Sequence, residues 1–202
     1  MTSVEIPELE PKPLFELRNL SHYRRYEKNQ SVFREGDRYR GPFIVSEGTF
    51  KVFIFGDIGK ESILHIFNTG DLVAGGPLFL GGNYPASCLA MTDGCLVEFD
   101  FNGLKALMEN DDEIYHYFAC KSMELMPHLK EKIFAVTLKS AELRIIDYLK
   151  SIGAERKSVK LGIPKNQLAA LLDLTPESVS RMFNQLTRKG RLVVEDELYR
   201  LQ

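Results

Sequence analysis

The chain has few of the residues on which redox clusters, disulfide frameworks and membrane spans depend. Its 202 residues include only three cysteines, Cys88, Cys95 and Cys120. An iron–sulfur cluster takes four thiolates, and three scattered cysteines make no disulfide framework, so we expect buried hydrophobic cysteines in a cytoplasmic protein. No apolar run approaches the roughly 18–20 residues of a membrane span. The acidic, proline-bearing N-terminus resembles neither a secretory signal nor a transit peptide.

Patterns of catalysis and metal binding are missing as well. The chain has no Ser/His/Asp arrangement, no CxxC pair and no phosphate-binding glycine loop. Its four histidines, His22, His65, His116 and His128, form no ligand motif. The β-rich region offers only His65, whereas a metal-dependent cupin needs several histidines and a carboxylate. We therefore expect neither enzymatic activity nor a bound metal ion.

What the sequence does contain is an uneven distribution of charge. Residues 1–138 hold 14 basic and 20 acidic residues, whereas residues 139–202 hold 12 basic and 8 acidic residues. An acidic N-terminal part and a basic C-terminal part are typical of a sensor or scaffold domain joined to a nucleic-acid-binding domain; the alternative is that the asymmetry arose by chance. We divide the chain into a sensor-like domain (1–101), a helix (102–138) and a DNA-binding domain (139–202).

The first part of the chain has the pattern of β structure. Between residues 31 and 100, short alternating runs are broken by Gly or Asp-Gly at the roughly 8–12-residue spacing of a sandwich or roll. From residue 102 to about 136 the pattern becomes helical. The acidic residues 111–113 favour a helix start, and Pro127 predicts a kink or interruption.

Apolar residues recur near heptad spacing along this helix. Such a stripe predicts pairing with a second copy in a parallel homodimer. The residues assigned to the dimer contact are Phe118, Leu125, Leu129 and Val136, with Ile133 on the same face.

The most specific pattern is LAALLDLTPESVSRMFNQLTRKGRLVV, residues 168–194. It predicts two short helices joined by a tight turn and followed by a β-ribbon. Thr175 can cap the second helix, and Pro176 suits its first position. Asp173 stands in the turn where glycine is common, which strains the backbone without excluding the turn. We interpret the segment as a helix-turn-helix, with an ordinary helical hairpin as the alternative.

The exposed face of the second helix suits a major groove. Arg181 can bind guanine O6 and N7, Glu177 can accept from a cytosine amino group, and Ser180 can serve either neighbour. Glu177 could instead serve only the helix dipole, and Arg181 could be a solvated basic residue. Residues better suited to phosphates are Lys165, Asn166, Gln167, Arg188, Lys189 and Arg191.

With these parts in order, residues 31–202 resemble the Crp/Fnr superfamily of bacterial transcription regulators. The resemblance rests on FREGD and FIVSEGTFKVFI, on GKESILHIFNTGDLV, and on LAALLDLTPESVSRMFNQLTRKGRL. Glu177-x-x-Ser180-Arg181 resembles the recognition helix of the Fnr-like branch. The resemblance implies an α+β fold with a β-roll, a long dimerisation helix and a winged helix-turn-helix. It also implies a homodimer that binds a palindromic TTGA-type operator on double-stranded DNA and contacts RNA polymerase.

The sensor-like domain departs from the cyclic-nucleotide-binding members of that superfamily. Ala74-Gly75 stands where a Gly-Glu pair would hold the ribose, and Pro85-Ala86 stands where Arg-Ser would pair with the phosphate. Cyclic AMP is therefore disfavoured as an effector. Haem stays open because some relatives sense gases with it, and a redox role stays open for Cys120. Two alternatives remain: a constitutive DNA binder controlled by abundance, and a ligand-binding module in which the β-roll carries the function.

Overall fold

The computed structural model describes Leu17 and residues 19–56 and 59–202, so most of the acidic N-terminal stretch lies outside the described residues. The chain divides into two compact units. The first comprises Met1–Ile54 and His65–His128, and the second comprises Phe55–Leu64 and Leu129–Gln202. The boundary between the units falls between His128 and Leu129, within the long helical region.

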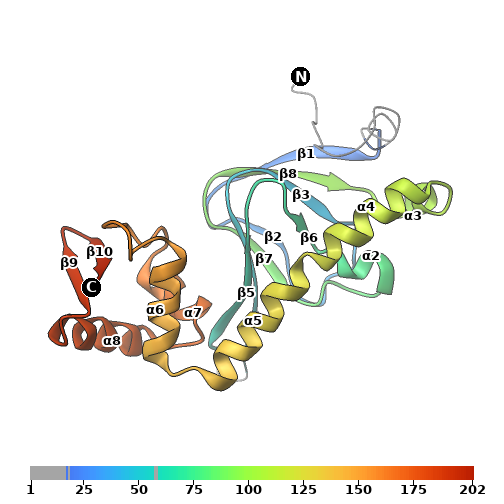
Figure 1. Cartoon of the computed structure of the whole chain (residues 1–202). Coiled ribbons are helices and arrows are strands. Elements are labelled where there is room, and N and C mark those ends of the chain that lie inside the picture. The colour runs from blue at the N-terminus through green and yellow to red at the C-terminus, as the bar shows by residue number, and fades with distance from the viewer. Residues whose placement is uncertain (1–16, 18, 57–58) are drawn as a thin grey trace. The chain divides into compact units, whose positions relative to one another are not determined.

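Two four-stranded sheets form the predicted β-roll (Figure 1). One sheet has the order β1-β8-β3-β6, from Ser21–Tyr26, Gly94–Phe99, Phe43–Glu47 and Leu72–Val73. The other has the order β2-β7-β4-β5, from Ser31–Phe33, Ser87–Ala90, Phe50–Phe55 and Glu61–Phe67. Strand β1 precedes the predicted β region. Its sequence SHYRRY has no apolar alternation, although Tyr26 is buried.

Aromatic rings fill the space between the two sheets. The ring of Phe33 stacks on that of Tyr84, with centroids 4.0 Å apart, and lies 5.6 Å from Phe43 of the facing sheet. Gly41 is required just before β3, because its φ is +147° and an added Cβ would lie 1.8 Å from the Phe99 carbonyl oxygen. The interior of the roll is therefore closely packed by its own side chains.

Helices accompany and follow the strands. Helix α2 (Gly76–Leu80) lies between β6 and β7, and α3 (Phe101–Met108), α4 (Asp112–Met123) and α5 (Leu125–Leu138) follow β8. The Asp111 carboxylate caps α4 by accepting from two backbone N–H groups, which confirms the predicted helix start. Helix α4 ends at Met123, the residue whose carbonyl the ring of Pro127 crowds. The predicted interruption is therefore present.

Phe118 does not lie in a dimer seam, and that prediction is wrong. Its side chain is 0% exposed and packs edge-to-face on Phe99, with ring centroids 5.5 Å apart. Leu125 also packs against the core of the roll, and Leu129 is half-buried. One apolar side of this helical region thus belongs to the interior of its own subunit.

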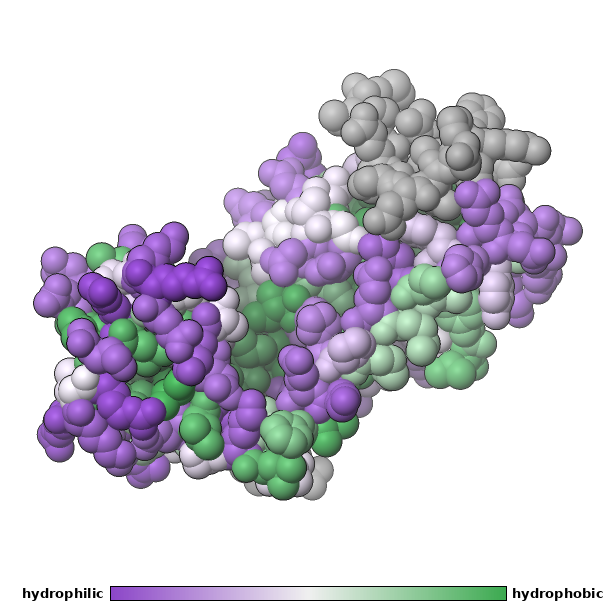
Figure 2. Space-filling model, in the orientation of Figure 1, coloured by the Kyte–Doolittle hydropathy of each residue, from purple (hydrophilic) through white to green (hydrophobic). Residues whose placement is uncertain are grey.

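Other large apolar residues of α4 and α5 are exposed. Figure 2 shows hydrophobic residues over the C-terminal end of α5. Val136 from the predicted dimer contact is among the exposed residues. Five of these exposed residues are here grouped under the name apolar stripe: Tyr115, Met123, Met126, Ile133 and Phe134.

The second unit contains the predicted helix-turn-helix and its ribbon. After α5 it contains α6 (Ala141–Ser151), α7 (Lys165–Leu171), α8 (Pro176–Arg188), β9 (Leu192–Glu195) and β10 (Leu198–Leu201). Its core includes Ile145, Leu149, Leu168, Val179 and Leu186, all 0% exposed. In the part of the chain that the structure describes, every helix is too short or too polar to cross a bilayer.

Candidate nucleic-acid interface

A side-chain cap fixes the start of α8. The Thr175 hydroxyl accepts from the backbone N–H of Ser178 at 3.2 Å, and Pro176 occupies the first helical position. Val179 and Phe183 bury the inner face of the helix. The predicted cap is confirmed, and the buried inner face holds the outer face of α8 in a defined direction.

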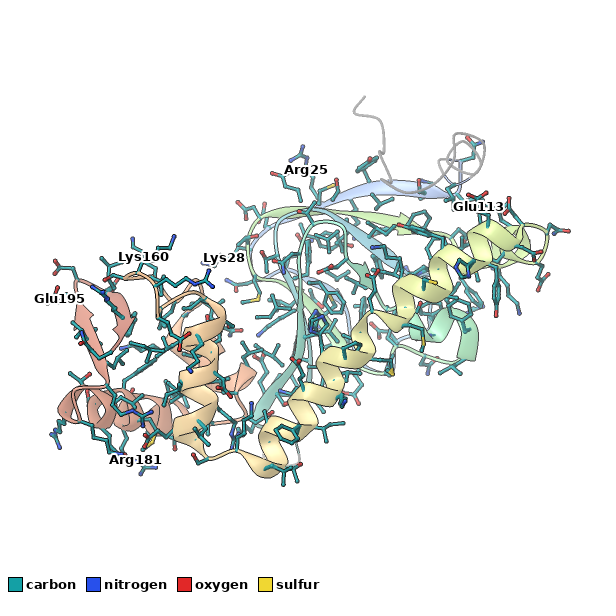
Figure 3. All side chains as sticks on the ribbon, in the orientation of Figure 1. Arg25, Lys28, Glu113, Lys160, Arg181 and Glu195 are labelled. Atoms are coloured by element: carbon teal, nitrogen blue, oxygen red, sulfur yellow. The ribbon has the colours of Figure 1, made fainter. Side chains whose placement is uncertain are left out.

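The outer face of α8 is exposed and polar. Glu177, Ser180 and Arg181 lie on it, together with Asn184 and Gln185. Four residues separate Glu177 from Arg181, which places them about one turn apart on the same side. Figure 3 shows Arg181 projecting away from the helix. The structure therefore brings the three predicted base-reading residues together on a face open to solvent.

Two of these side chains also make local contacts. The backbone N–H of Glu177 and the nearby Thr175 hydroxyl stabilise the Glu177 carboxylate and lower its pKa. The Arg181 guanidinium lies 3.4 Å from the Ser178 hydroxyl, a long contact that leaves it free to turn. Glu177 thus has a structural partner at the helix start, whereas Arg181 is only weakly held.

The predicted phosphate contacts fall into two groups. Lys165, Asn166 and Gln167 form the first turn of α7, where Lys165 and Asn166 are exposed and Gln167 is half-buried. The Lys165 ammonium lies 5.7 Å from the centre of the Phe183 ring. Arg188 is exposed in the last turn of α8. Lys165 and Arg188 therefore flank the outer face of α8 as accessible cations.

Lys189 and Arg191 have a different environment. Both form ion pairs with Glu142 near the start of α6, at 3.0 Å and 2.5 Å. These cations hold the pKa of Glu142 below its usual range. Glu142 was not predicted as their partner, because it lies 47 residues before Lys189 in the sequence. Both cations are therefore partly neutralised by this carboxylate, which weakens their attraction to a phosphate.

The tip of the β9–β10 ribbon carries negative charge. Glu195 ends β9, and Asp196 and Glu197 form the turn with φ values of +47° and +61°. All three are exposed, and Glu195 is labelled at the ribbon in Figure 3. Phosphates repel carboxylates, so this tip opposes a contact with the DNA backbone.

The segment corresponding to a phosphate-binding cassette is filled by the chain itself. An added Cβ on Gly75 would lie 2.4 Å from the Ser122 hydroxyl oxygen of α4. The Tyr39 hydroxyl donates to the Ala74 carbonyl at 2.9 Å. Neither this segment nor Pro85-Ala86 supplies a cation for a cyclic phosphate. The residues present do not fit a cyclic nucleotide.

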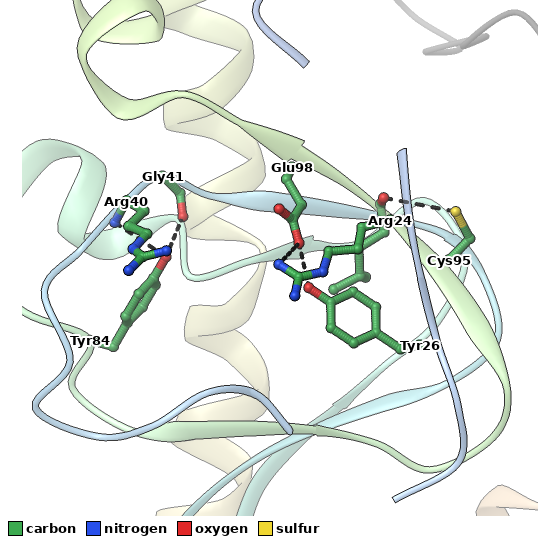
Figure 4. A network of polar contacts seen from close by, with 8 residues as sticks. Arg24, Tyr26, Arg40, Gly41, Tyr84, Cys95 and Glu98 are labelled. Carbon is green, nitrogen blue, oxygen red and sulfur yellow. Dashed lines mark hydrogen bonds and ion pairs between the residues drawn. The ribbon is translucent and has the colours of Figure 1, made fainter. Parts of the chain in front are cut away.

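The roll also has a hollow of about 490 Å³ beside β1 and β8. Figure 4 shows its polar network, in which Glu98 pairs with Arg24 at 3.7 Å and accepts from the Tyr26 hydroxyl. Burial and the bond to Glu98 raise the pKa of Tyr26. Three arginines and three carboxylates line the hollow, so it has no net charge that would select an ion.

The histidines and cysteines occupy contrasting places. The rings of His65 and His128 are 4.6 Å apart and tilted by 34°, so they lie against each other with no space for a porphyrin between them. Burial and the nearby His128 lower the pKa of His65.

Burial raises the pKa of the Cys88 and Cys95 thiols, as predicted for inert cysteines. For Cys120 the prediction of a buried cysteine is wrong: it is exposed, with its sulfur 3.4 Å from a ring nitrogen of His116.

Two family models match the chain, one over the β-roll region and the other over the helix-turn-helix region. A cyclic nucleotide-binding domain matches residues 23–111, and a Crp-like helix-turn-helix domain matches residues 143–201. A β-roll of this kind followed by a helix-turn-helix defines a class of DNA-binding transcription regulators.

Similar proteins narrow the class to one family. The transcriptional activator protein Anr of Pseudomonas aeruginosa is 25% identical over 179 residues, which cover 83% of this chain and 71% of Anr. The fumarate and nitrate reduction regulatory protein of Escherichia coli K12 is 22% identical over 176 residues, covering 84% and 70%. The chain belongs to the Crp/Fnr family of transcription regulators.

A solved structure agrees with the fold. The regulator CLP of Xanthomonas campestris, described as responsive to c-di-GMP, superposes with a TM-score of 0.82 at 19% identity. The match covers 95% of this chain and 99% of that chain. The α+β architecture with a β-roll, a long helix and a C-terminal helix-turn-helix is therefore that of the family.

Proposed function

We propose that this protein is a cytoplasmic homodimer that binds a palindromic TTGA-type operator and regulates transcription through contact with RNA polymerase. The observation that carries the proposal is the outer face of α8, where Glu177, Ser180 and Arg181 lie together and exposed on a helix that is capped and anchored. A rigid helix with a short-chained, hydrogen-bonding face is what major-groove reading requires.

The roles follow from the chemistry of each side chain. Arg181 offers two parallel donors to guanine O6 and N7, and Glu177 offers an acceptor to a cytosine amino group. Ser180 lies between them. Lys165 and Arg188 contact phosphates and set the register without selecting sequence. Asn166 and Gln167 at the start of α7 supplement these contacts.

The apolar stripe supports the proposed dimer. Ile133 is 67% exposed and Met123 is 64% exposed, which is costly for side chains of this size unless a partner covers them. Parallel pairing of two stripes would bury both and relate two copies of α8 by a twofold axis. The seam replaces the predicted set that included Phe118, and retains Val136 and Leu129 at its border.

The regulator works without a cyclic nucleotide in this proposal. Ser122 leaves no room for a side chain at Gly75, which favours a roll that is packed before any ligand arrives, and hence constitutive DNA binding. The alternative is an effector of another chemistry, either a gas bound through haem or an oxidant acting on the exposed Cys120 thiol. Absorption spectra and metal analysis of protein purified without oxygen separate these alternatives.

The proposed function is tested by fluorescence anisotropy with three duplexes of equal length. One carries TTGA and its inverted copy, one carries a single half-site, and one has scrambled half-sites. We expect the palindrome to bind at least about 1,000-fold more tightly than the scrambled duplex, the lower range for specific recognition. Equal affinity for all three duplexes would overturn the proposal.

A further inference from the structure

The turn between α7 and α8 holds an unusual residue for its backbone. Asp173 has φ +53°, in the left-handed region where glycine carries the least strain. The sequence already marks this position, because glycine is common there. A residue that keeps a strained conformation points to an interaction that glycine could not make.

That interaction is an ion pair with Lys132 of α5. The Lys132 ammonium lies 2.7 Å from the Asp173 carboxylate and also donates to the Leu171 carbonyl at 3.1 Å. Each side chain of the pair is 17% exposed. By contrast, the side chains of Lys150 and Glu155, which pair at the surface, are 48% and 54% exposed. Water therefore screens this pair less than the surface pairs of the protein.

Two further cations meet the same turn within the second unit. Lys60 donates to the Asp173 carbonyl at 2.9 Å, and Arg144 donates to the Leu172 carbonyl at 2.6 Å. These carbonyls lie at the C-terminal end of α7, where no intrahelical donor remains and the helix dipole favours positive charge. Residues outside the helix-turn-helix thus bind the turn. Among these contacts, the one from α5 is the ion pair, because both Lys132 and the Asp173 carboxylate are charged.

Helix α5 also carries part of the apolar stripe. Ile133 directly follows Lys132 on α5. The residue that pairs with Asp173 in the turn is therefore next to a residue of the proposed dimer seam. A motion of the helix-turn-helix relative to α5 would change the separation of the two reading helices in the dimer. An operator with half-sites one helical turn apart, about 34–36 Å, requires that separation to be fixed.

We propose that Lys132 and Asp173 are positioning residues for operator recognition: their ion pair fixes the helix-turn-helix to α5 and thereby selects the spacing between half-sites. This inference rests on the proposed dimeric, operator-binding function. Lys132 and Asp173 touch no base in this scheme. They act by holding α8 at a set distance from the twofold axis.

The test compares affinities for palindromes whose central spacer varies by one base pair, together with a single half-site. Wild-type protein should prefer one spacing sharply, because each added base pair shifts the second half-site by about 3.4 Å and turns it around the DNA axis. Asp173→Asn keeps a residue that tolerates positive φ and removes only the charge. It should lose about tenfold in affinity for the preferred palindrome, as expected when contacting charges are uncoupled.

Two more variants separate positioning from folding. Asp173→Gly relieves the backbone strain, so its melting temperature should not fall sharply while its preference for one spacing weakens. Lys132→Arg preserves the charge and should retain most of the wild-type preference, whereas Lys132→Gln should behave like Asp173→Asn. Half-site affinity should stay within about twofold of wild type in every variant, because the base-reading face is unchanged.

Three results would overturn the inference. One is an equal loss of affinity for the half-site and the palindrome, which would make the ion pair a folding contact of the helix-turn-helix. Another is a gain of affinity in Lys132→Gln, which would make the pair an inhibitory lock. The third is an unchanged spacing preference in Asp173→Asn. If wild-type protein itself did not prefer any palindrome over a half-site, the proposed function would fail before the ion pair was tested.

Discussion

Replacement of Arg181 by alanine tests the proposed recognition most directly. In the free protein Arg181 is exposed, and its guanidinium approaches the Ser178 hydroxyl at 3.4 Å. Removing such a side chain should change the free energy of unfolding by no more than about 0.5 kcal/mol. Any large fall in DNA affinity in Arg181→Ala can therefore be assigned to recognition and not to folding.

The expected loss of affinity in Arg181→Ala follows from the arginine–guanine interaction, which a dimer makes once in each half-site. A bidentate bond between arginine and guanine contributes about 1–3 kcal/mol of discrimination, and a dimer on a palindrome makes two such bonds. The variant should thus lose about 2–6 kcal/mol, or at least roughly 30-fold in Kd, on the palindrome. Arg181→Lys keeps the charge but lacks the planar fork, so it should lose most of the guanine preference as well.

The assay is anisotropy over a series of salt concentrations, on the palindrome and on a duplex with its guanines replaced. Arg188→Ala is the matched control from the same helix. It should weaken both duplexes by a similar factor and lower the slope of log K against log salt by about 0.9 for each phosphate that the variant no longer neutralises. Lys189 is unsuitable as this control because it pairs with Glu142. If Arg181→Ala weakened both duplexes equally, Arg181 would bind a phosphate and the assignment of α8 to base reading would fail.

Four further outcomes are expected. Met126→Glu should yield a monomer in sedimentation at micromolar concentration, because it places a charge in the apolar stripe; a persistent dimer would refute the seam. Cyclic AMP should leave the melting temperature unchanged, since any ligand of the native state alone raises it. Asp196→Asn should strengthen binding to scrambled DNA at low salt, and weaker binding would refute repulsion at the ribbon tip. Because the pKa of His65 is lowered in the folded protein, the unfolded chain takes up a proton at a higher pH than the folded protein does, and the free energy of unfolding should fall as pH drops through about 6.5. The dependence of that free energy on pH, measured by denaturant titration, should be smaller in His65→Gln.

The local features of the helix-turn-helix were predictable because their causes are local. Thr175 caps α8 three residues from its bonded N–H, and the alternation of buried and exposed residues on α8 follows from helix geometry alone. The same holds for the start of α4 at Asp111. The base-reading candidates were therefore located on the correct face without any knowledge of tertiary contacts.

Features that depend on distant parts of the chain were not predictable. Helical periodicity identified apolar residues on α4, but it could not tell that Phe118 faces the roll while Met123 faces solvent. Likewise the basic residues after α8 gave no indication that Lys189 and Arg191 share Glu142. Strand β1 was missed because its residues are mostly polar, and only pairing with β8 makes it a strand.

The close approach of Gly75 and Ser122 bears on how the roll could be engineered. A glutamate at position 75, of the kind that would hold a ribose, would bring its Cβ to 2.4 Å from the Ser122 oxygen and 2.7 Å from a Leu72 methyl group. The Ser122 hydroxyl cannot easily turn aside, because it donates to the Phe118 carbonyl at 2.7 Å. Neither the glutamate nor an arginine at position 85 would help alone. Engineered nucleotide binding would therefore require substitutions that depend on one another. Ser122 would first have to be replaced by a smaller residue, because only then could the glutamate at position 75 be accommodated and act together with the arginine at position 85.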